Sequence, residues 1–280
     1  MYFEVVQKFY GFLEIHFESC NHIFISGRDC YYISSFRSKK EALACVDLSF
    51  LILNSYKPVY NCNHCYITEY DGCFFILFLI RRYKFYVSFL FKPLIVLNSI
   101  HLEWRKDWIL KSDYICSFYS SIKGKYPLVD ESIHYYLSLL DFSIYLLKDY
   151  DDYYDYGCLQ HNRFLLDEYF NPIFFKIDVK ERDFANYLKY LFFSGTYEKI
   201  DIFKLISAGR NQFNYDLVLI RLLFPDYYFD LFDEIVLEKV NCSLLCSVID
   251  KQNSYMTYIQ KIYNEIEKVY PIKKDIKIIS

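Results

Sequence analysis

Four side chains between residues 161 and 178 are of the types that handle metals and phosphates. His161 is followed by Arg163 and Glu168, and Asp178 ends the apolar run FFKID. Carboxylate oxygens suit magnesium, so Glu168 and Asp178 could hold the metal of a bound nucleotide. A guanidinium accepts neither a proton nor a hydrogen bond. Arg163 therefore could not act as a catalytic base.

The elements that must position these residues change in character near residue 100. Before it, strand-forming runs dominate, at EIHFE (14–18), HIFISG (22–27), CYYISS (30–35), HCYITEY (64–70) and twice within 73–91. The turn Tyr70-Asp71-Gly72 predicts a hairpin. One helix, 38–56, interrupts the strands; Ser38 and Glu41 have the spacing of a capping box. Its core face follows helical spacing at Ala42, Leu43, Val46, Ser49, Phe50 and Leu53.

After residue 100 the apolar periodicity is mostly helical. Helices are expected at 103–122, 130–149, 182–195 (ending at Gly195), 198–209 (ending at Gly209), 215–224 (before Pro225), 225–239 and from 243 to about 270. A short β-rich stretch, 156–178, carries the four residues described above. This order predicts an α+β fold with a β-rich lobe at 1–98 and a mostly helical lobe at 99–280.

The stretch HNRFLLDE resembles the catalytic loop of aminoglycoside-phosphotransferase-like enzymes, which reads H-G-D-x-x-x-x-N. In that comparison His161 matches the histidine, Asn162 replaces glycine, Arg163 replaces the aspartate that orients the substrate hydroxyl, and Glu168 replaces the metal-binding asparagine. The resemblance implies phosphoryl transfer, which depends on positioning and on neutralising phosphate charge. The substitutions imply that no catalytic residue remains in the loop.

A wider set of motifs over roughly 100–235 resembles the kinase-like spore coat protein family of low-GC Gram-positive bacteria. The motifs are WRKDWILKSDY (104–114), SIHYYLSLLDFSIYLL (132–147), the HNRF loop, DVKERDFA (178–185) and RLLFPDYYFD (221–230). The chain is similar to the group of that family with an H-x-R loop. The resemblance implies a protein-kinase-like, two-lobed fold.

Two further features of active relatives are missing from the small lobe. The first hairpin, HIFISGRDCYYISSF, has one glycine and no G-x-G, so no backbone cradle for phosphates is expected. Where a strand lysine should hold the phosphates stands Ser34 or Ser35, and Lys39 and Lys40 follow at the helix start.

Other residues of the region have structural explanations. We expect His161 to pack beneath the next segment and bond to backbone, Asp183 to be a helix N-cap, and Arg182 to pair with an acidic neighbour. We expect no structural metal. The pair Cys62 and Cys65 lacks a second ligand pair at suitable spacing, although Cys20, His22 and Cys73 could approach it.

Bulk composition limits the partners. A net charge of −3 offers no electrostatic reason to bind nucleic acid. Arg81, Arg82 and Lys84 interrupt the most apolar stretch, so we expect no membrane span. No secretory signal is visible, and irregularly spaced cysteines fit a reducing cytoplasm.

The sequence therefore predicts a catalytically degenerate, cytoplasmic kinase-like protein without cofactor. We expect it to have a structural or interaction role with protein partners, and to belong to the spore coat if the source organism sporulates. The alternative is an atypical small-molecule or sugar kinase in which Asp178 and Glu168 bind Mg-ATP and Lys39 or Lys40 replaces the strand lysine. A nucleotide or ligand sensor without chemistry also remains open.

Overall fold

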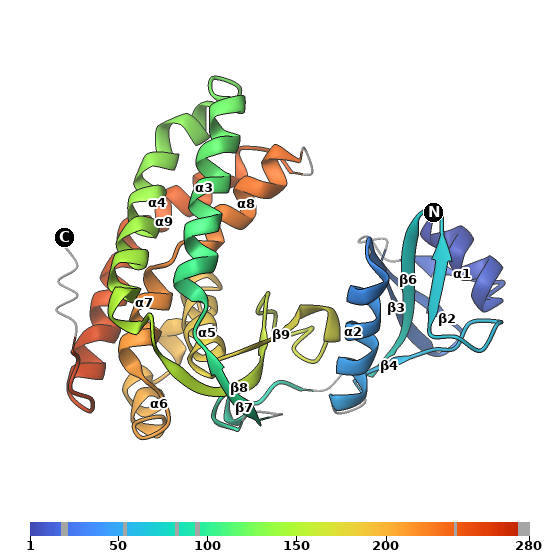
Figure 1. Cartoon of the computed structure of the whole chain (residues 1–280), viewed down its shortest axis with the longest axis horizontal. Helices are drawn as coiled ribbons and strands as arrows, with labels where there is room; N and C mark the ends of the chain where they lie inside the picture. Colours follow the sequence, from blue (N-terminus) through green and yellow to red (C-terminus); the bar gives the residue numbers. More distant parts are fainter. Residues whose placement is uncertain (18–21, 53–54, 82–83, 93–95, 238–239, 274–280) are drawn as a thin grey trace. The chain divides into compact units, whose positions relative to one another are not determined.

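Strand-forming residues of the amino-terminal part build an antiparallel sheet in the computed structural model (Figure 1). The structure describes residues 1–17, 22–52, 55–81, 84–92, 96–237 and 240–273. Within them, the strands of this sheet are β1 (His16–Phe17), β2 (Ile23–Ser26), β3 (Asp29–Phe36), β4 (Tyr56–Pro58), β5 (Ile67–Tyr70) and β6 (Cys73–Ile80). Their order is β1-β2-β3-β6-β4, and β5 pairs with β6 as well.

The hairpin predicted at Tyr70-Asp71-Gly72 is confirmed. Tyr70 pairs with Cys73, and the two residues between them have left-handed φ values of 50° at Asp71 and 71° at Gly72. Positive φ at both central residues defines a type I′ turn, whose twist matches that of the flanking strands.

Each face of the sheet is covered by one helix. Helix α1 (Tyr2–Tyr10) buries Val5 and Val6 against one face, together with Ile33 of β3. Helix α2 (Lys39–Leu51) covers the opposite face, together with Tyr32 of β3. Because side chains alternate along a strand, the two neighbours in β3 serve opposite cores.

Helix α2 differs in detail from the expectation. Ser38 caps it, but its hydroxyl accepts from the N–H of Lys40 at 3.2 Å rather than from that of Glu41. Leu43 and Phe50, expected in the core, are 48% and 58% exposed. The helix packs through small or short side chains instead, and Leu53 lies outside the described residues.

Four elements in the first hundred or so residues were predicted wrongly or missed. The second strand expected within 73–91 is a 3₁₀-helix, η1 (Val87–Phe91); Phe85 and Phe89 pack there in an apolar cluster with Tyr169. Helix α1, strand β4 and strand β7 (Val96–His101) were not foreseen. Residues 82 and 83 of the expected charged turn and residue 18 of the first expected strand lie outside the described residues.

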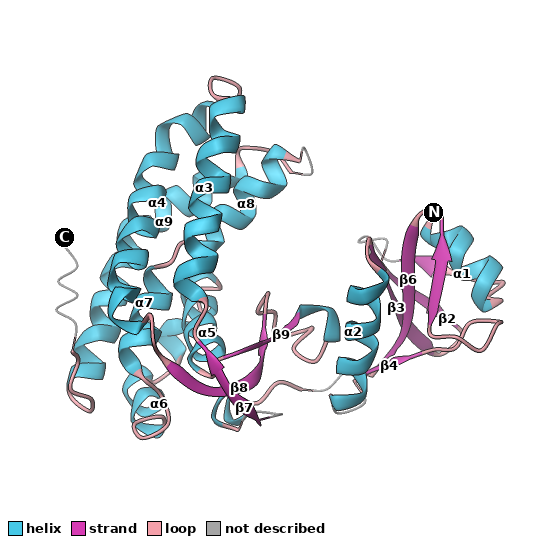
Figure 2. Cartoon of the chain, in the orientation of Figure 1, coloured by secondary structure: helices cyan, strands magenta, loops and turns pink. Residues whose placement is uncertain are grey.

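The rest of the chain is mainly helical, as Figure 2 shows. Its helices are α3 (Trp104–Ile122), α4 (Pro127–Leu146), α5 (Glu181–Phe193), α6 (Ile202–Ala208), α7 (Tyr215–Leu223), α8 (Asp226–Val236) and α9 (Leu244–Glu267). Short 3₁₀ turns lie at η2 (Leu147–Tyr150), η3 (Pro172–Phe174) and η4 (Tyr197–Lys199). The predicted stops at Gly195, Gly209 and Pro225 are confirmed.

A second, three-stranded sheet has the order β7-β8-β9, with β8 (Tyr154–His161) in the centre and β9 (Phe175–Asp178) at one edge. It contains the β-rich stretch that the sequence indicated at 156–178.

Residues cluster into two compact units. One comprises Met1–Ile95 and Leu159–Ile177, and the other comprises Val96–Cys158 and Asp178–Ser280. The loop with His161 and Glu168 thus groups with the amino-terminal sheet, whereas the expected division was a single boundary between 98 and 99.

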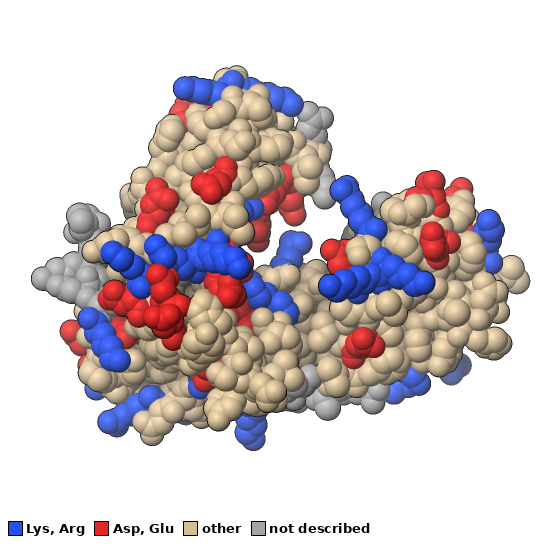
Figure 3. All heavy atoms as spheres, viewed as in Figure 1, with Lys and Arg blue, Asp and Glu red and all other residues tan. Residues whose placement is uncertain are grey.

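The described surface and helices bear on possible partners. Basic and acidic side chains are interspersed over both units on the face shown in Figure 3. Among the described helices, none combines the length and apolarity needed to cross a bilayer. The cysteines in the described parts carry free thiols.

Candidate functional site

The loop after β8 is anchored by His161. Its side chain is 1% exposed, and its Nε2 lies in hydrogen-bonding contact with the carbonyl of Tyr169. The imidazole packs against the rings of Tyr169 and Phe175, with centroids 4.2 and 4.3 Å away. Next to it, the N–H of Asn162 donates to the carbonyl of Phe174. This geometry supports the predicted structural role of His161.

Arg163 and Glu168 lie in the same loop in different settings. The side chain of Arg163 is exposed. Glu168 is half-buried, and its Oε2 accepts a hydrogen bond of 3.1 Å from Nδ2 of Asn171. Asn171 in turn accepts from the N–H of Ile173 at 3.3 Å and caps η3. Glu168 therefore helps to shape the turn that leads into β9.

Asp178, at the end of β9, is surrounded by donors. Its Oδ1 accepts from Nε1 of Trp104 and from the N–H of Val179, both at 2.8 Å. Its Oδ2 accepts from Nη1 of Arg182 at 2.9 Å. The residue as a whole is 5% exposed. Its charge is balanced by the adjacent guanidinium, and both of its oxygens accept hydrogen bonds.

Helix α5 begins immediately after Asp178 and carries both residues that the sequence marked as structural. The predicted acidic partner of Arg182 is confirmed, because its guanidinium forms an ion pair with Asp178. The two side chains are buried, with 8% of Arg182 and 7% of Asp178 exposed. The N-cap prediction for Asp183 is wrong. The helix starts at Glu181 after Lys180, so Asp183 is its third residue, and it is buried.

A second buried ion cluster lies in the same unit and was missed in the sequence. Asp226 accepts from Nζ of Lys189 at 2.7 Å and from Nη2 of Arg221 at 2.9 Å. The guanidinium of Arg221 also lies over the indole of Trp104, 5.6 Å from its centroid. The signal available in the sequence was a single basic residue inside each of the apolar runs YLKYLFF and VLIRLLF.

The charges of this cluster perturb one another. Burial lowers the pKa of Lys189 to about 8, although Asp226 opposes the shift. Burial and the nearby Arg182 lower the pKa of Arg221 to about 10. Burial disfavours ionised Asp226, but Lys189 and Arg221 outweigh it and hold its pKa below the usual value. The cluster is an internal ion network in which the one carboxylate of Asp226 faces two cations, Lys189 and Arg221.

Glu181 is a second buried acid at the start of α5. Its Oε1 accepts from the N–H of Asn214 at 2.8 Å, while its buried Oε2 has no hydrogen-bond partner among the described residues. Burial raises the pKa of this carboxyl to about 7, against the opposing backbone N–H of Asn214.

The phosphate-holding lysine of kinases has no counterpart on β3. In kinases this lysine pairs with a glutamate of the helix that packs on the sheet. Ser35 bonds through Oγ to the hydroxyl of Tyr2 at 3.0 Å and so faces α1. Alternation then places Ser34 on the α2 side, where it is 7% exposed. The buried positions of α2 carry no acid; they are Ala42, Cys45, Val46 and Ser49.

Asp178 is poorly placed to hold the metal of Mg-ATP. Magnesium binds through carboxylate oxygens, and those of Asp178 already accept three hydrogen bonds, from Trp104, Val179 and Arg182. Across the described parts of the chain, no group of three histidine, cysteine or acidic side chains is placed to hold a metal ion. Cys62 and Cys65 are both exposed, and Cys20 lies outside the described residues.

Comparison with known proteins places the fold. No protein-family model and no curated protein sequence matches the chain. Among solved structures, an aminoglycoside phosphotransferase from Alicyclobacillus acidocaldarius superposes with a TM-score of 0.58 at 10% sequence identity, covering 92% of this chain and 93% of that one. The AMP-bound complex of a spectinomycin phosphotransferase gives a TM-score of 0.48 at 12% identity, covering 97% and 98%.

The first of these matches confirms the expected fold class. The chain has the α+β, protein-kinase-like fold of aminoglycoside phosphotransferases, with two lobes. At 10% identity the likeness concerns the fold alone.

Proposed function

We propose that this chain, which has a phosphotransferase fold, is a catalytically degenerate kinase-like protein with a structural or interaction role. The observation that carries the proposal is the engaged carboxylate of Asp178, whose oxygens accept from Trp104, Val179 and Arg182. A metal ion at Oδ2 would compete with a buried ion pair. Removing one partner of such a pair costs about 3–5 kcal/mol.

Two other positions support the same function. Arg163 puts a cation where the reaction needs a group that accepts a hydrogen bond from the substrate hydroxyl. Ser34 stands on the strand where a lysine would hold the nucleotide phosphates, opposite a helix without an inward acid. Of the three groups that the reaction needs, the catalytic base and the phosphate-holding lysine are thus replaced, and the metal-binding aspartate already accepts hydrogen bonds from other residues.

The proposal is tested by nucleotide binding to the purified full-length chain. We expect no saturable rise in melting temperature with ATP or GTP and magnesium. A ligand present at 100 times its dissociation constant stabilises a protein by about 2.7 kcal/mol, which for a chain of 280 residues is a shift of roughly 5 °C. An active aminoglycoside phosphotransferase serves as the positive control. A saturable, magnesium-dependent shift for this chain would overturn the proposal.

A second candidate is an atypical phosphotransferase for a hydroxylated small molecule. It is favoured by the match to an aminoglycoside phosphotransferase over nearly the whole chain. In this candidate Glu168 and Asp178 bind Mg-ATP, and Lys39 or Lys40 approaches the phosphates. It predicts ATP consumption with some hydroxylated substrate, which Asp178→Ala abolishes; turnover that survives this substitution excludes the assigned metal ligand.

The proposed partners are proteins rather than nucleic acids, in keeping with the net charge of −3. We place the chain in the cytoplasm, or in the spore coat if its source sporulates. The second location rests on the resemblance of the motifs between residues 100 and 235 to kinase-like spore coat proteins.

A further inference from the structure

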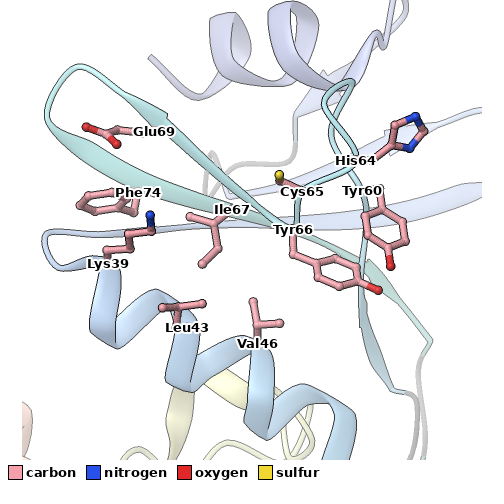
Figure 4. A pocket seen from close by; sticks show the side chains of 10 residues that line it. All are labelled: Lys39, Leu43, Val46, Tyr60, His64, Cys65, Tyr66, Ile67, Glu69 and Phe74. Carbon is pink, nitrogen blue, oxygen red and sulfur yellow. The ribbon is translucent and has the colours of Figure 1, made fainter.

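The amino-terminal unit contains a pocket beside its antiparallel sheet. It has a volume of about 420 Å³ and lies between α2 and the strand β5 (Figure 4). Leu43 and Val46 of the helix and Ile67 of the strand form its apolar centre. This explains the exposure of Leu43, which faces the pocket rather than the core. Pockets of this size with apolar linings and a few polar groups are typical binding sites.

The polar groups lie at the two ends of the pocket. Lys39 and Glu69 are at one end, and the stacked rings of Tyr60 and Tyr66, with centroids 4.1 Å apart, are at the other (Figure 4). Both Lys39 and Glu69 are exposed. Among the described residues neither forms an ion pair, so both charges remain available to a ligand.

The strand beside the pocket has an open backbone edge. Tyr70 and Cys73 flank the two-residue type I′ turn, so they form a hydrogen-bonded pair of the hairpin. Because hydrogen-bonded and non-hydrogen-bonded pairs alternate along an antiparallel ladder, the backbone groups of Tyr70 and Thr68 point toward β6. Ile67 and Glu69 direct theirs away from the sheet. The carbonyl of Ile67 confirms this direction, because it accepts from Nδ2 of Asn61 at 3.3 Å.

That edge has no strand on its outer side among the described residues, since β5 pairs with β6 alone. The N–H and C=O of Glu69 therefore point away from β6, next to the pocket. An exposed edge of this kind is a template for another extended chain. Asn61 occupies the carbonyl of Ile67 and limits the free edge to the stretch around Glu69.

We propose that the groove between α2 and β5 binds an extended peptide segment of a partner protein, which adds as a strand to the edge of β5 at Glu69. Main-chain hydrogen bonds to Glu69 supply part of the affinity, and alternate side chains of the peptide enter the pocket, as in other cases of strand addition.

The pocket defines the preferred peptide. One large apolar side chain fits between Leu43, Val46 and Ile67, and polar or charged side chains meet Lys39 and Glu69 at the rim. A small apolar molecule would use the pocket but not the strand edge, so the backbone contribution separates the two kinds of ligand. The inference does not depend on whether the chain binds nucleotide.

The test begins with selection of a displayed random octapeptide library on the purified full-length chain. Enriched peptides are synthesised with a fluorescein label, and their dissociation constants are measured by fluorescence polarisation. Leu43→Arg should weaken binding at least tenfold. The matched control is Leu244→Arg on α9, because the two leucines are 48% and 47% exposed; it should change the constant less than twofold.

The strand edge is tested separately. Glu69→Pro removes an N–H that points away from β6, so no bond inside the sheet is lost, and proline is tolerated on edge strands at such positions. We expect it to reduce binding at least tenfold, while Glu69→Ala, which keeps the N–H, retains main-chain pairing and stays within fivefold of the parent.

A second measurement covers the case in which Glu69→Pro unfolds. Peptides N-methylated at single alternate backbone amides keep their side chains but cannot pair, and they should lose at least tenfold in affinity. The proposal is overturned if no peptide is enriched, if Leu43→Arg binds as well as the parent, or if binding is insensitive to backbone N-methylation.

Discussion

Replacing Asp178 by asparagine distinguishes a structural carboxylate from a metal ligand by the sign of its effect on stability. Asparagine keeps the size of the side chain and one accepting oxygen, but it puts an NH₂ group where Oδ2 now accepts from Arg182 at 2.9 Å. The guanidinium, 8% exposed, then loses this charged acceptor. Breaking a buried pair on one side costs about 3–5 kcal/mol.

The measurement is urea unfolding followed by far-ultraviolet circular dichroism. We expect the unfolding free energy of Asp178→Asn to fall by about 3 kcal/mol or more. The double variant Asp178→Asn/Arg182→Met should recover part of this loss, because the buried charge disappears with its partner; this coupling is the pairwise energy of the interaction.

A surface pair provides the matched control. Arg105 and Asp151 approach to 2.8 Å, similar to the buried pair, but their side chains are 36% and 45% exposed. Asp151→Asn should therefore cost about 1 kcal/mol or less.

A metal ligand would behave differently. A carboxylate held ready for an absent cation commonly costs stability, so its neutralisation in the metal-free protein should be neutral or stabilising. If Asp178→Asn destabilised the chain no more than Asp151→Asn, the structural assignment of Asp178 would be refuted.

Three further predictions follow from other buried groups. The pKa of Glu181 is raised to about 7 in the folded chain from an ordinary 4.5, so its protonated form stabilises the fold fully below pH 4.5 and this stabilisation, about 3 kcal/mol, is lost as the pH rises through 7; Glu181→Gln should remove that part of the pH dependence of urea unfolding, and an unchanged slope would contradict it. Gly209→Ala should destabilise by about 1–3 kcal/mol, since an added Cβ would lie 2.5 Å from the ring of Phe213; a thermal melt equal to that of the parent would show that the ring can move. Trp104→Phe keeps an aromatic ring but removes the N–H that donates to Asp178; a loss of about 1.5–3 kcal/mol is expected in Asp178 protein and a smaller one in the Asp178→Asn background.

Much of the local structure was predictable because it depends on neighbouring residues. The type I′ turn at Asp71-Gly72 and the helix ends at Gly195 and Pro225 follow from backbone preferences of a few consecutive residues. The second strand expected after β6 was predicted wrongly because its conformation depends on residues far away in the sequence. An apolar run fits a strand or a buried turn equally well, and packing of Phe89 against Tyr169 settles it as the 3₁₀-helix η1.

Part of the candidate site was likewise predictable from the sequence, and part was not. The sequence by itself determined which chemistry is missing, because a guanidinium at Arg163 and a hydroxyl at Ser34 cannot do the work of a carboxylate and an ammonium wherever they lie. It also indicated that Arg182 pairs with an acidic neighbour, without showing which one.

Only the tertiary structure decided the state of Asp178. Its partner Trp104 is 74 residues away, and Lys189 meets Asp226 over a separation of 37. Such contacts depend on how the helices pack, which no local preference encodes. The sequence therefore determined the residues available for chemistry, and the folded chain decided which of their charges are already neutralised, because burial beside a distant donor changes what a carboxylate can still bind.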